Sequence, residues 1–227
     1  MLSDEPNADA VDARALLAAG NNADLYELVF QAHGLGYRRD ATLFASEEDP
    51  PPYYGNMLTL RPDAKEAQRA EALALTRKRR SVGVKDGFHR LDLSSDGFDL
   101  LFEAAWVWAP AESLQETDWE QVRDADALSM WENAWQAAGS PADCRVFPSS
   151  LLSDPRVAFL GRRGKDGYDA GCILNRSGGC IGLSNIFGPP DDAEVHAAAA
   201  AAEFAEGLPV VVSGSWWKLS NGALRAW

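Results

Sequence analysis

Two apolar segments of the sequence contain polar side chains that could take part in chemistry. Glu103 stands inside the apolar run Leu100–Val107, where burial would raise the pKa of its carboxyl group and make it a candidate general base. Ser184 and Asn185 are the polar side chains of the segment Cys180–Phe187. Each has a plainer alternative, because Glu103 could face water on an edge strand and Asn185 could hold a bulge or turn.

Several common catalytic and binding motifs are absent from the sequence. The segment Gly182–Ile186 has a serine but lacks the second glycine of the G-x-S-x-G turn that serine hydrolases use. No phosphate-binding loop, dinucleotide fingerprint or H-E-x-x-H zinc motif occurs. The histidines occur singly, and the three cysteines have no metal-ligand spacing. The sequence therefore predicts no metal site.

The charge, the apolar runs and the number of cysteines limit the binding partners and the cellular compartment that we expect for this protein. The 227 residues contain 34 Asp and Glu against 21 Lys and Arg, a net charge of −13. We expect no nucleic acid as partner, because such a chain repels phosphate backbones. We also expect no membrane partner, because no run approaches the ~20 apolar residues of a membrane span. The acidic first residues are unlike a secretion signal, and an odd number of cysteines is unlike a disulfide framework, so the expectation is a cytoplasmic protein.

The clearest structural pattern lies in the second half of the sequence. Three apolar strands joined by short turns predict an antiparallel meander. The expected strands are Val157–Arg162, Tyr168–Arg176 and Cys180–Phe187. An amphipathic helix precedes them, with Trp131 and Trp135 on its apolar face and the intervening Glu132 expected in solvent. An alanine-rich helix over Ala193–Ala205 and an apolar strand over Leu208–Val212 are expected to follow.

The first half of the sequence shows a similar but weaker order of elements. A strand at Asn56–Leu60, an alanine-rich helix and a strand at Ser81–Val84 follow one another as their counterparts do in the second half. The apolar segment Phe98–Trp108 is expected to form one long strand. We favour a duplication, with halves at residues 1–110 and 111–227, over chance similarity between common elements.

Three short sequences carry a resemblance to a known family. Val157–Leu160, Asn175–Gly179 and Gly182–Phe187 are similar to sequences of uncharacterised GNAT-like proteins. The order of elements in residues 118–212 resembles the core of the GNAT superfamily of N-acetyltransferases, and residues 23–108 resemble a degenerate copy. The resemblance implies an α+β fold, with a mixed, mostly antiparallel sheet flanked by helices and two halves in tandem.

The resemblance also implies where a cofactor would bind. In a GNAT fold, the strand before the alanine-rich helix splays away from the strand after it, and the gap admits the pantetheine arm of acetyl-CoA. By this resemblance the backbone at Ser184–Phe187 would hold the thioester carbonyl, and the N-terminus of the following helix would bind the pyrophosphate. The expected catalytic residues are Ser184, Asn185 and Glu103. The expected cofactor-binding residues are Ile186, Phe187, Gly188, Asp192 and Ala193.

The loop before the alanine-rich helix departs from the superfamily's pattern. That pattern is Gln/Arg-x-x-Gly-x-Gly/Ala, whereas this chain reads Phe-Gly-Pro-Pro-Asp-Asp over residues 187–192. Two prolines supply no N–H group, and two aspartates beside the helix start would repel a phosphate or serve as N-caps.

Two functions from different classes therefore remain open. We favour a GNAT-like N-acyltransferase that transfers an acetyl or acyl group from acyl-CoA, with acetyl-CoA as donor, to an amine of a small molecule or peptide. The alternative is a catalytically inactive GNAT-like binding or assembly protein that has lost the pyrophosphate loop. The cationic run Arg77–Arg80 could bind the 3′-phosphate of coenzyme A, or complement a helix C-terminus. A homodimer is compatible with either function.

Overall fold

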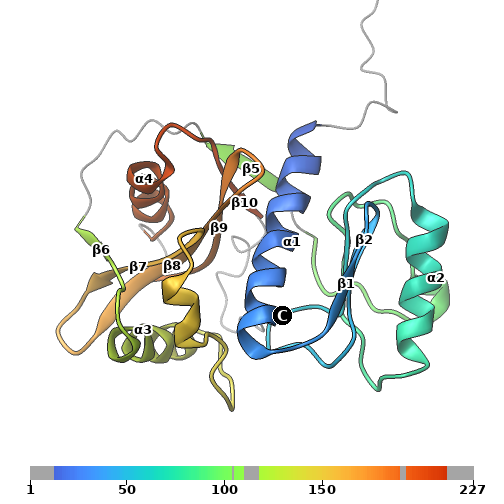
Figure 1. The fold of residues 1–227 in the computed structure, drawn as a ribbon, viewed down its shortest axis with the longest axis horizontal. Helices are drawn as coiled ribbons and strands as arrows, with labels where there is room; N and C mark the ends of the chain where they lie inside the picture. The colour runs from blue at the N-terminus through green and yellow to red at the C-terminus, as the bar shows by residue number, and fades with distance from the viewer. Residues whose placement is uncertain (1–12, 104, 110–117, 190–192, 214–227) are drawn as a thin grey trace, which may run out of the picture.

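The structure is a computed structural model that describes residues 13–103, 105–109, 118–189 and 193–213. Within these ranges the fold is α+β, with two mostly antiparallel sheets flanked by helices. A long helix, α1 (Ala13–His33), stands between the two sheets (Figure 1). None of the helices in these ranges is both long and apolar enough to cross a membrane. The predicted fold class is confirmed.

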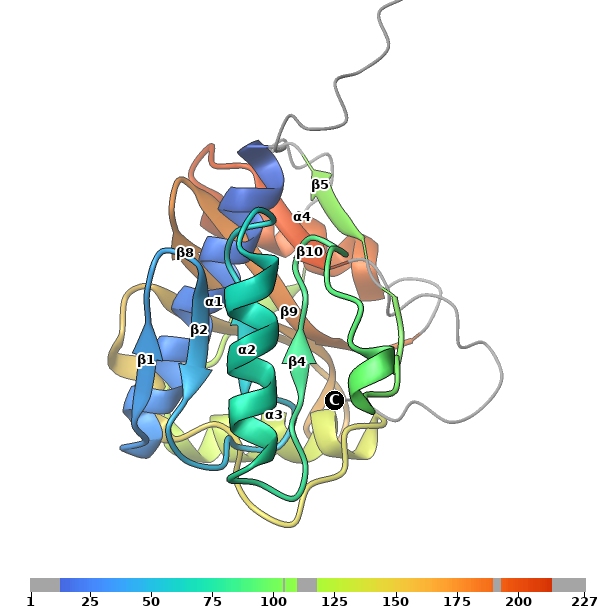
Figure 2. The same cartoon turned by 90° about the vertical axis from the view of Figure 1, so that its right-hand side faces the viewer.

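The smaller sheet has four strands in the order β1-β2-β3-β4, of which only β3 and β4 are parallel neighbours. The strands are β1 (Tyr37–Arg39), β2 (Leu43–Ser46), β3 (Met57–Thr59) and β4 (Val84–Lys85). Helix α2 (Lys65–Thr76) covers the face turned away from α1 (Figure 2). Successive side chains of a strand point to opposite faces, so Phe44 packs with α1, whereas Leu43 and Ala45 pack beneath α2.

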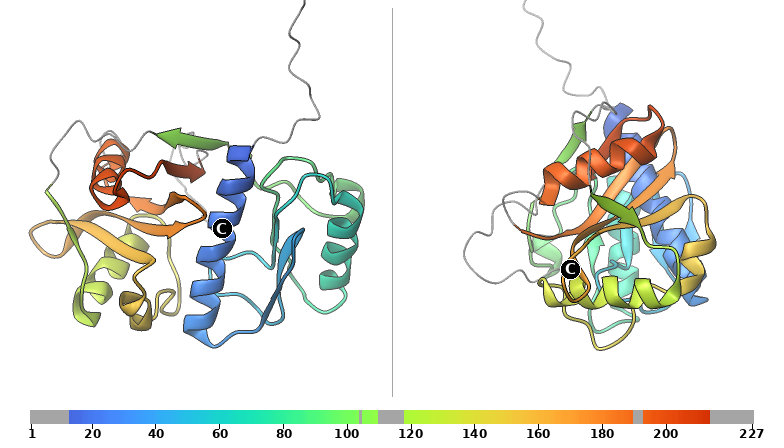
Figure 3. Two further views of the ribbon diagram at one scale, coloured as in Figure 1. Left: turned by 45° about the horizontal axis from the view of Figure 1, so that its top comes forward. Right: turned by 90° about the vertical axis from the view of Figure 1, so that its left-hand side faces the viewer.

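The larger sheet has six strands in the order β5-β10-β9-β8-β7-β6. The strands are β5 (Trp106–Ala109), β6 (Trp119–Gln121), β7 (Val157–Arg163), β8 (Tyr168–Ser177), β9 (Cys180–Phe187) and β10 (Val210–Ser213). Helices α3 (Ala125–Ala137) and α4 (Ala193–Ala205) lie on opposite faces of this sheet (Figure 3). Two short 3-10 helices complete the described elements: η1 (Ser94–Asp96) and η2 (Ser149–Ser153). The predicted meander is confirmed as β7-β8-β9, and the alanine-rich helix as α4.

A pair of buried asparagines fixes α1 to the larger sheet. The side-chain amide of Asn21 donates to the backbone oxygen of Asn175 at 3.1 Å and to Ser177 Oγ at 3.0 Å. In return, Asn175 Nδ2 donates to the backbone oxygen of Asn21 at 2.9 Å. Both asparagines are 2% exposed, so these bonds satisfy amides that would otherwise be costly to bury. A helix from the first half of the sequence is thus held against strands from the second half.

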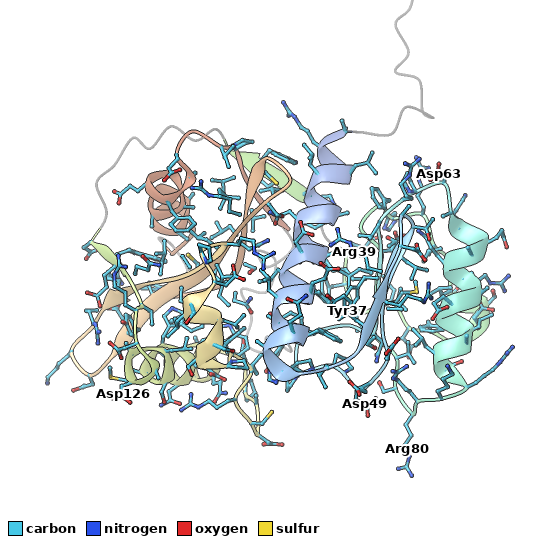
Figure 4. The ribbon with its side chains drawn as sticks, in the orientation of Figure 1. Tyr37, Arg39, Asp49, Asp63, Arg80 and Asp126 are labelled. Carbon is cyan, nitrogen blue, oxygen red and sulfur yellow. The ribbon has the colours of Figure 1, made fainter. Side chains whose placement is uncertain are left out.

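An ion-pair group fixes the other side of α1 to the smaller sheet. Arg39 of β1 lies between that strand and α1 (Figure 4), where its guanidinium pairs with Asp24 at 2.5 Å and Glu27 at 3.2 Å. All three side chains are about one quarter exposed, so water screens the pairs only in part. Helix α1 therefore has polar anchors to both sheets.

The prediction of one long strand over Phe98–Trp108 is wrong. Only Trp106–Ala109 forms a strand, and it pairs antiparallel with β10 in the larger sheet. Residues 100, 101 and 102 are instead irregular and exposed, at 75%, 56% and 53%. The physical reason is the need for a partner, because an apolar run becomes a strand only where a neighbouring strand pairs its backbone groups. Here β10 provides that partner for four residues.

The expectation that Glu132 is solvated is also wrong. Its side chain is 0% exposed, because the segment carrying Arg145 and Val146 folds over this face of α3. One carboxylate oxygen accepts a hydrogen bond from the Val146 N–H at 2.6 Å, and the other lies 3.5 Å from the Arg145 guanidinium. Helical periodicity correctly placed Trp131 in the core, but it could not reveal a loop that covers the neighbouring side chain.

The division into halves at residues 1–110 and 111–227 stays a prediction. The smaller sheet lies within the first half, and strands β6 to β10 lie within the second. Strand β5, from the first half, pairs with β10 of the second. Each sheet is therefore built mainly from one proposed half. Strand β5 and helix α1, both from the first half, contact the sheet of the second half.

Two neighbouring tyrosines yield a test of this core. Tyr26 and Tyr54 pack edge to face, with ring centroids 4.8 Å apart. The Tyr26 hydroxyl accepts a hydrogen bond from the Gly55 N–H at 3.1 Å, whereas the buried Tyr54 hydroxyl has no partner among the described residues. Tyr26→Phe is expected to lower the free energy of unfolding by about 1–2 kcal/mol, because it leaves the Gly55 N–H unpaired.

Tyr54→Phe provides the matched variant, since it keeps the ring and removes an unpaired buried hydroxyl. We expect it to be neutral or to raise the free energy of unfolding by up to about 1 kcal/mol. Urea unfolding of both variants measures the difference. Equal losses of stability in the two variants would contradict these hydrogen-bond assignments.

Candidate functional site

A cleft of about 2180 Å³ lies where the smaller sheet, α1 and the larger sheet come together. Its wall includes Lys85 of β4, Asn22 of α1, Ser184 and Asn185 of β9, and Val211 of β10. This volume exceeds the ~300–1000 Å³ of most small-molecule pockets, because the cleft is broad and open to solvent and extends along much of the first half of the chain. All three predicted catalytic residues, Ser184, Asn185 and Glu103, line this cleft.

The pairing between β9 and β10 covers only part of β9. The two strands are parallel, and the paired residues are Val210 with Ile181, Val211 with Gly182 and Val212 with Leu183. Strand β9 then continues through Ser184–Phe187, a stretch that pairs with no residue of β10 as described. Ser184, Asn185 and Ile186 are half-buried rather than buried. Among the described residues, no strand therefore pairs with the β10-facing edge of this stretch, which we call the open edge.

A β-bulge interrupts the same stretch on its other side. Ser184 lies opposite Ile173 and Phe187 opposite Gly171, so three steps along β9 match two steps along β8. Asn185 provides the extra residue, with φ of +51°, a conformation that asparagine tolerates better than most residues. Its side-chain amide donates to Ser184 Oγ at 3.1 Å. The structural role predicted for Asn185 as the holder of a bulge fits this geometry.

Comparison with solved structures identifies the architecture. The chain aligns with a GCN5-related N-acetyltransferase from Kribbella flavida over 96% of its own length and 91% of the other chain, with a TM-score of 0.57 and 11% identity. The fold is GNAT-like. A functionally unknown conserved protein from Staphylococcus epidermidis aligns over 79% of this chain and 83% of its own, with a TM-score of 0.50 and 10% identity. No family model matches the chain, and no curated protein matches it by sequence.

Within the GNAT-like fold, Glu103 lies on the irregular segment that precedes β5. Its side chain is 64% exposed, and its carboxylate lies 3.3 Å from His89 Nε2. The buried placement suggested by its apolar neighbours is therefore wrong. Glu103 faces water, as in the alternative, but from an irregular segment and not from an edge strand. Its role as a base stays a prediction, now resting on its place at the cleft rather than on burial.

The residues predicted to bind a cofactor fall at the end of β9 and the start of α4. Phe187 is 7% exposed and packs edge-on against Trp131, with ring centroids 5.2 Å apart. Gly188 follows with φ of +144°, which favours glycine. Ile186 packs partly against the core beneath α4. Ala193 is the first residue of α4, and Asp192 lies outside the described residues.

The cationic run Arg77–Arg80 is used in part for structure. The Arg79 side chain is 8% exposed, donates to the backbone oxygen of Ser46 at 3.0 Å and pairs with Asp49 at 3.3 Å. Arg80 is exposed and points away from the body of the protein (Figure 4). Binding of a phosphate by this run stays a prediction. No group of three metal-ligating side chains occurs among the described residues.

Sequence reasoning missed Lys85, the last residue of β4. Its side chain is half-buried in the cleft, with the ammonium nitrogen 5.3 Å from the centre of the Trp106 ring. Burial lowers the pKa of this ammonium group to about 8. The neighbouring Asp86 is engaged elsewhere, because its carboxylate accepts hydrogen bonds from Thr59 Oγ1 and from the Leu91 N–H. The sequence predicted a strand over Ser81–Val84, whereas β4 spans Val84–Lys85, so Lys85 lies within the strand and not directly after it.

Proposed function

We propose that the chain is an N-acyltransferase that takes an acyl group from acyl-CoA, with acetyl-CoA as the donor, and transfers it to an amine of a small molecule or peptide. The GNAT-like fold supports this proposal at the level of architecture. The observation that carries it is the open edge of β9 at Ser184–Phe187, beyond the last pair with β10 and beside a large cleft.

The open edge provides the donors that acyl transfer needs. Backbone N–H groups that face the gap between β9 and β10 can donate to the thioester carbonyl, and they bind more tightly as that oxygen becomes an anion. The bulge at Asn185 turns the strand and holds it in this form, with Ser184 and Asn185 linked by a hydrogen bond. Phe187 anchors the end of the open edge to the core through Trp131.

The phosphates of the donor would lie near the start of α4. A helix N-terminus presents unpaired N–H groups and a partial positive charge, and α4 begins at Ala193. Gly188 can present its own N–H group, whereas Pro189 has none. With fewer donors than a glycine-rich loop would supply, we expect weak to moderate affinity for the pyrophosphate.

The acceptor amine would enter through the cleft. A net charge of −13 attracts cations over a distance, so a protonated amine is the favoured class of acceptor. Such an amine must lose a proton before it attacks the thioester. Glu103, exposed on the cleft wall beside His89, is the carboxylate proposed to accept that proton.

Thermal unfolding with acetyl-CoA tests the proposal. A ligand at 100 times its Kd stabilises a protein by about 2.7 kcal/mol, which for a chain of this size raises Tm by about 5–10 °C. Ser184→Trp places a bulky ring at the open edge and is expected to abolish the shift. Ser95→Trp is the matched control, because Ser95 is exposed and does not line the cleft.

The outcomes separate the two classes of function. A shift that survives in Ser95→Trp and disappears in Ser184→Trp supports an acyl-CoA site at β9. The absence of any shift at millimolar acetyl-CoA would contradict the proposal. It would favour a binding or assembly protein on the same fold.

A further inference from the structure

Lys85 differs from the other lysines in the described part of the chain. Lys65, Lys78 and Lys165 are exposed, whereas Lys85 is half-buried. Lys65, Lys78 and Lys85 line the cleft, and Lys165 does not. No carboxylate of the described residues forms an ion pair with it, and its ammonium nitrogen lies over the Trp106 ring at 5.3 Å. Nothing in the proposed transfer to an external amine uses this side chain. The proposed function therefore does not explain why a lysine without an ion pair is half-buried at this position.

The sheet register brings Lys85 close to the open edge of β9. Trp106 lies opposite Ser213 on β10, and the last β10–β9 pair joins Val212 to Leu183. The next row across the sheet thus runs from Trp106 through Ser213, the last residue of β10, toward Ser184. One strand, β10, therefore separates Trp106 from β9 in the sheet.

The side chains of this row also share one face of the sheet. Trp106 packs with Ala18 of α1, so its ring lies on the α1 face. Leu183 packs beneath α4 on the opposite face, and Ser184, the next residue, therefore points to the α1 face. Lys85, above Trp106, stands on the face where Ser184 borders the cleft. A thioester held at the open edge would lie within the same space as the Lys85 amine.

The state of this amine suits a nucleophile. With a pKa of about 8, about a quarter of the Lys85 side chains are neutral at pH 7.5, against about one in a thousand for an ordinary lysine. A neutral amine has the free electron pair that attack on a carbonyl carbon requires. An amine bound by a carboxylate would instead remain protonated.

We propose that Lys85 is itself an acyl acceptor, modified by the acyl-CoA that binds in the cleft. The neutral amine nitrogen attacks the thioester carbonyl carbon, the C–S bond breaks, and an amide bond forms. Coenzyme A leaves as its thiol, after the sulfur takes up the proton that the nitrogen loses. This inference rests on the proposed function, because it needs a donor at β9.

The modification would change the cleft in two ways. It removes the positive charge above Trp106, and it adds an acyl group to a side chain that already borders the site. An acylated Lys85 would occupy space that an external amine would use. Self-acylation would thus lower the rate of transfer to other acceptors.

Mass spectrometry of the full chain tests the proposal. The protein is incubated with isotopically labelled acetyl-CoA, and the label is quantified at each lysine after digestion with a protease that does not cut at lysine. We expect Lys85 to be labelled at least about tenfold faster than Lys165, because burial lowers the pKa of the Lys85 amine and the proposed donor site borders the same cleft as Lys85. Excess coenzyme A should suppress labelling at Lys85 and leave Lys165, which does not line the cleft, unchanged.

Lys85→Arg is the variant that completes the test. It keeps a cation over Trp106, so it should fold and retain the thermal shift with acetyl-CoA, while the fast label disappears. Equal labelling rates at Lys85 and Lys165, in a protein whose Tm rises with acetyl-CoA, would overturn this inference alone. No rise in Tm together with no preferential labelling would overturn both this inference and the proposed function.

Discussion

Gly182→Ala is expected to lower the free energy of unfolding by about 3 kcal/mol. Gly182 lies on β9, opposite Val211 on one side and Asn175 on the other. A Cβ at this position would overlap the side-chain oxygens of Asn21 and Asn175. To make room, the two amides must separate, which breaks the buried bonds that hold α1 against the sheet. The loss combines steric strain with unpaired polar groups.

Gly20→Ala is the matched control, since it makes the same chemical change within α1. A Cβ at Gly20 would meet no described atom within 4 Å apart from its chain neighbours and the backbone of its own helix, and alanine is the better helix former. We expect a gain in stability of about 0.5–1 kcal/mol. Chemical denaturation of both variants gives the comparison. A Gly182→Ala protein as stable as the parent would show that the asparagine pair does not fix α1.

Trp131→Ala is expected to lower the free energy of unfolding by about 4 kcal/mol. The Trp131 side chain is 0% exposed and packs edge-on against Phe159 and Phe187, with both centroid distances at 5.2 Å. Its indole N–H donates to the backbone oxygen of Leu160 at 2.8 Å. The substitution leaves a large cavity in the core and removes the hydrogen bond to Leu160. Because Phe187 ends the open edge of β9, the variant should also weaken acetyl-CoA binding.

Trp119→Phe is the control for the loss of an indole. The Trp119 side chain is buried, but its indole N–H has no partner among the described residues. Replacement by phenylalanine therefore removes no hydrogen bond, and we expect a change of less than about 1 kcal/mol. Thermal unfolding of the two variants, each with and without acetyl-CoA, separates the effect on stability from the effect on binding. A small loss in Trp131→Ala would contradict the central role of this side chain.

The parts of the fold that the sequence predicted are those determined by local pattern. The apolar strands of the meander are bounded by glycine-rich turns, and the six-alanine run strongly favours a helix, so β7-β8-β9 and α4 were predictable. The segment before β5 is just as apolar, but it has no neighbouring strand along most of its length. The sequence of the segment itself does not show whether a neighbouring strand is available to pair with it. The same limit explains Glu132, which a distant loop covers.

In the candidate site, too, the residues marked by the local sequence were predictable, and those placed by distant segments were not. Ser184 and Asn185 were identifiable because polar residues are unusual in an apolar strand, and both border the cleft. The positive φ of Asn185 was not predictable, since it depends on how β9 pairs with β8. Lys85 was missed because its environment is built by α1 and by Trp106 of β5, which are distant in sequence. Its low pKa follows from that enclosure.

The most direct test of an acyl-CoA site at the open edge of β9 is a titration of the backbone amide NMR signals with acetyl-CoA. We expect the largest saturable changes at Ser184, Asn185, Ile186, Phe187 and Gly188, with little change at the paired residues of β7. Unaltered signals from Ser184 to Gly188 at saturating acetyl-CoA would contradict the proposed site.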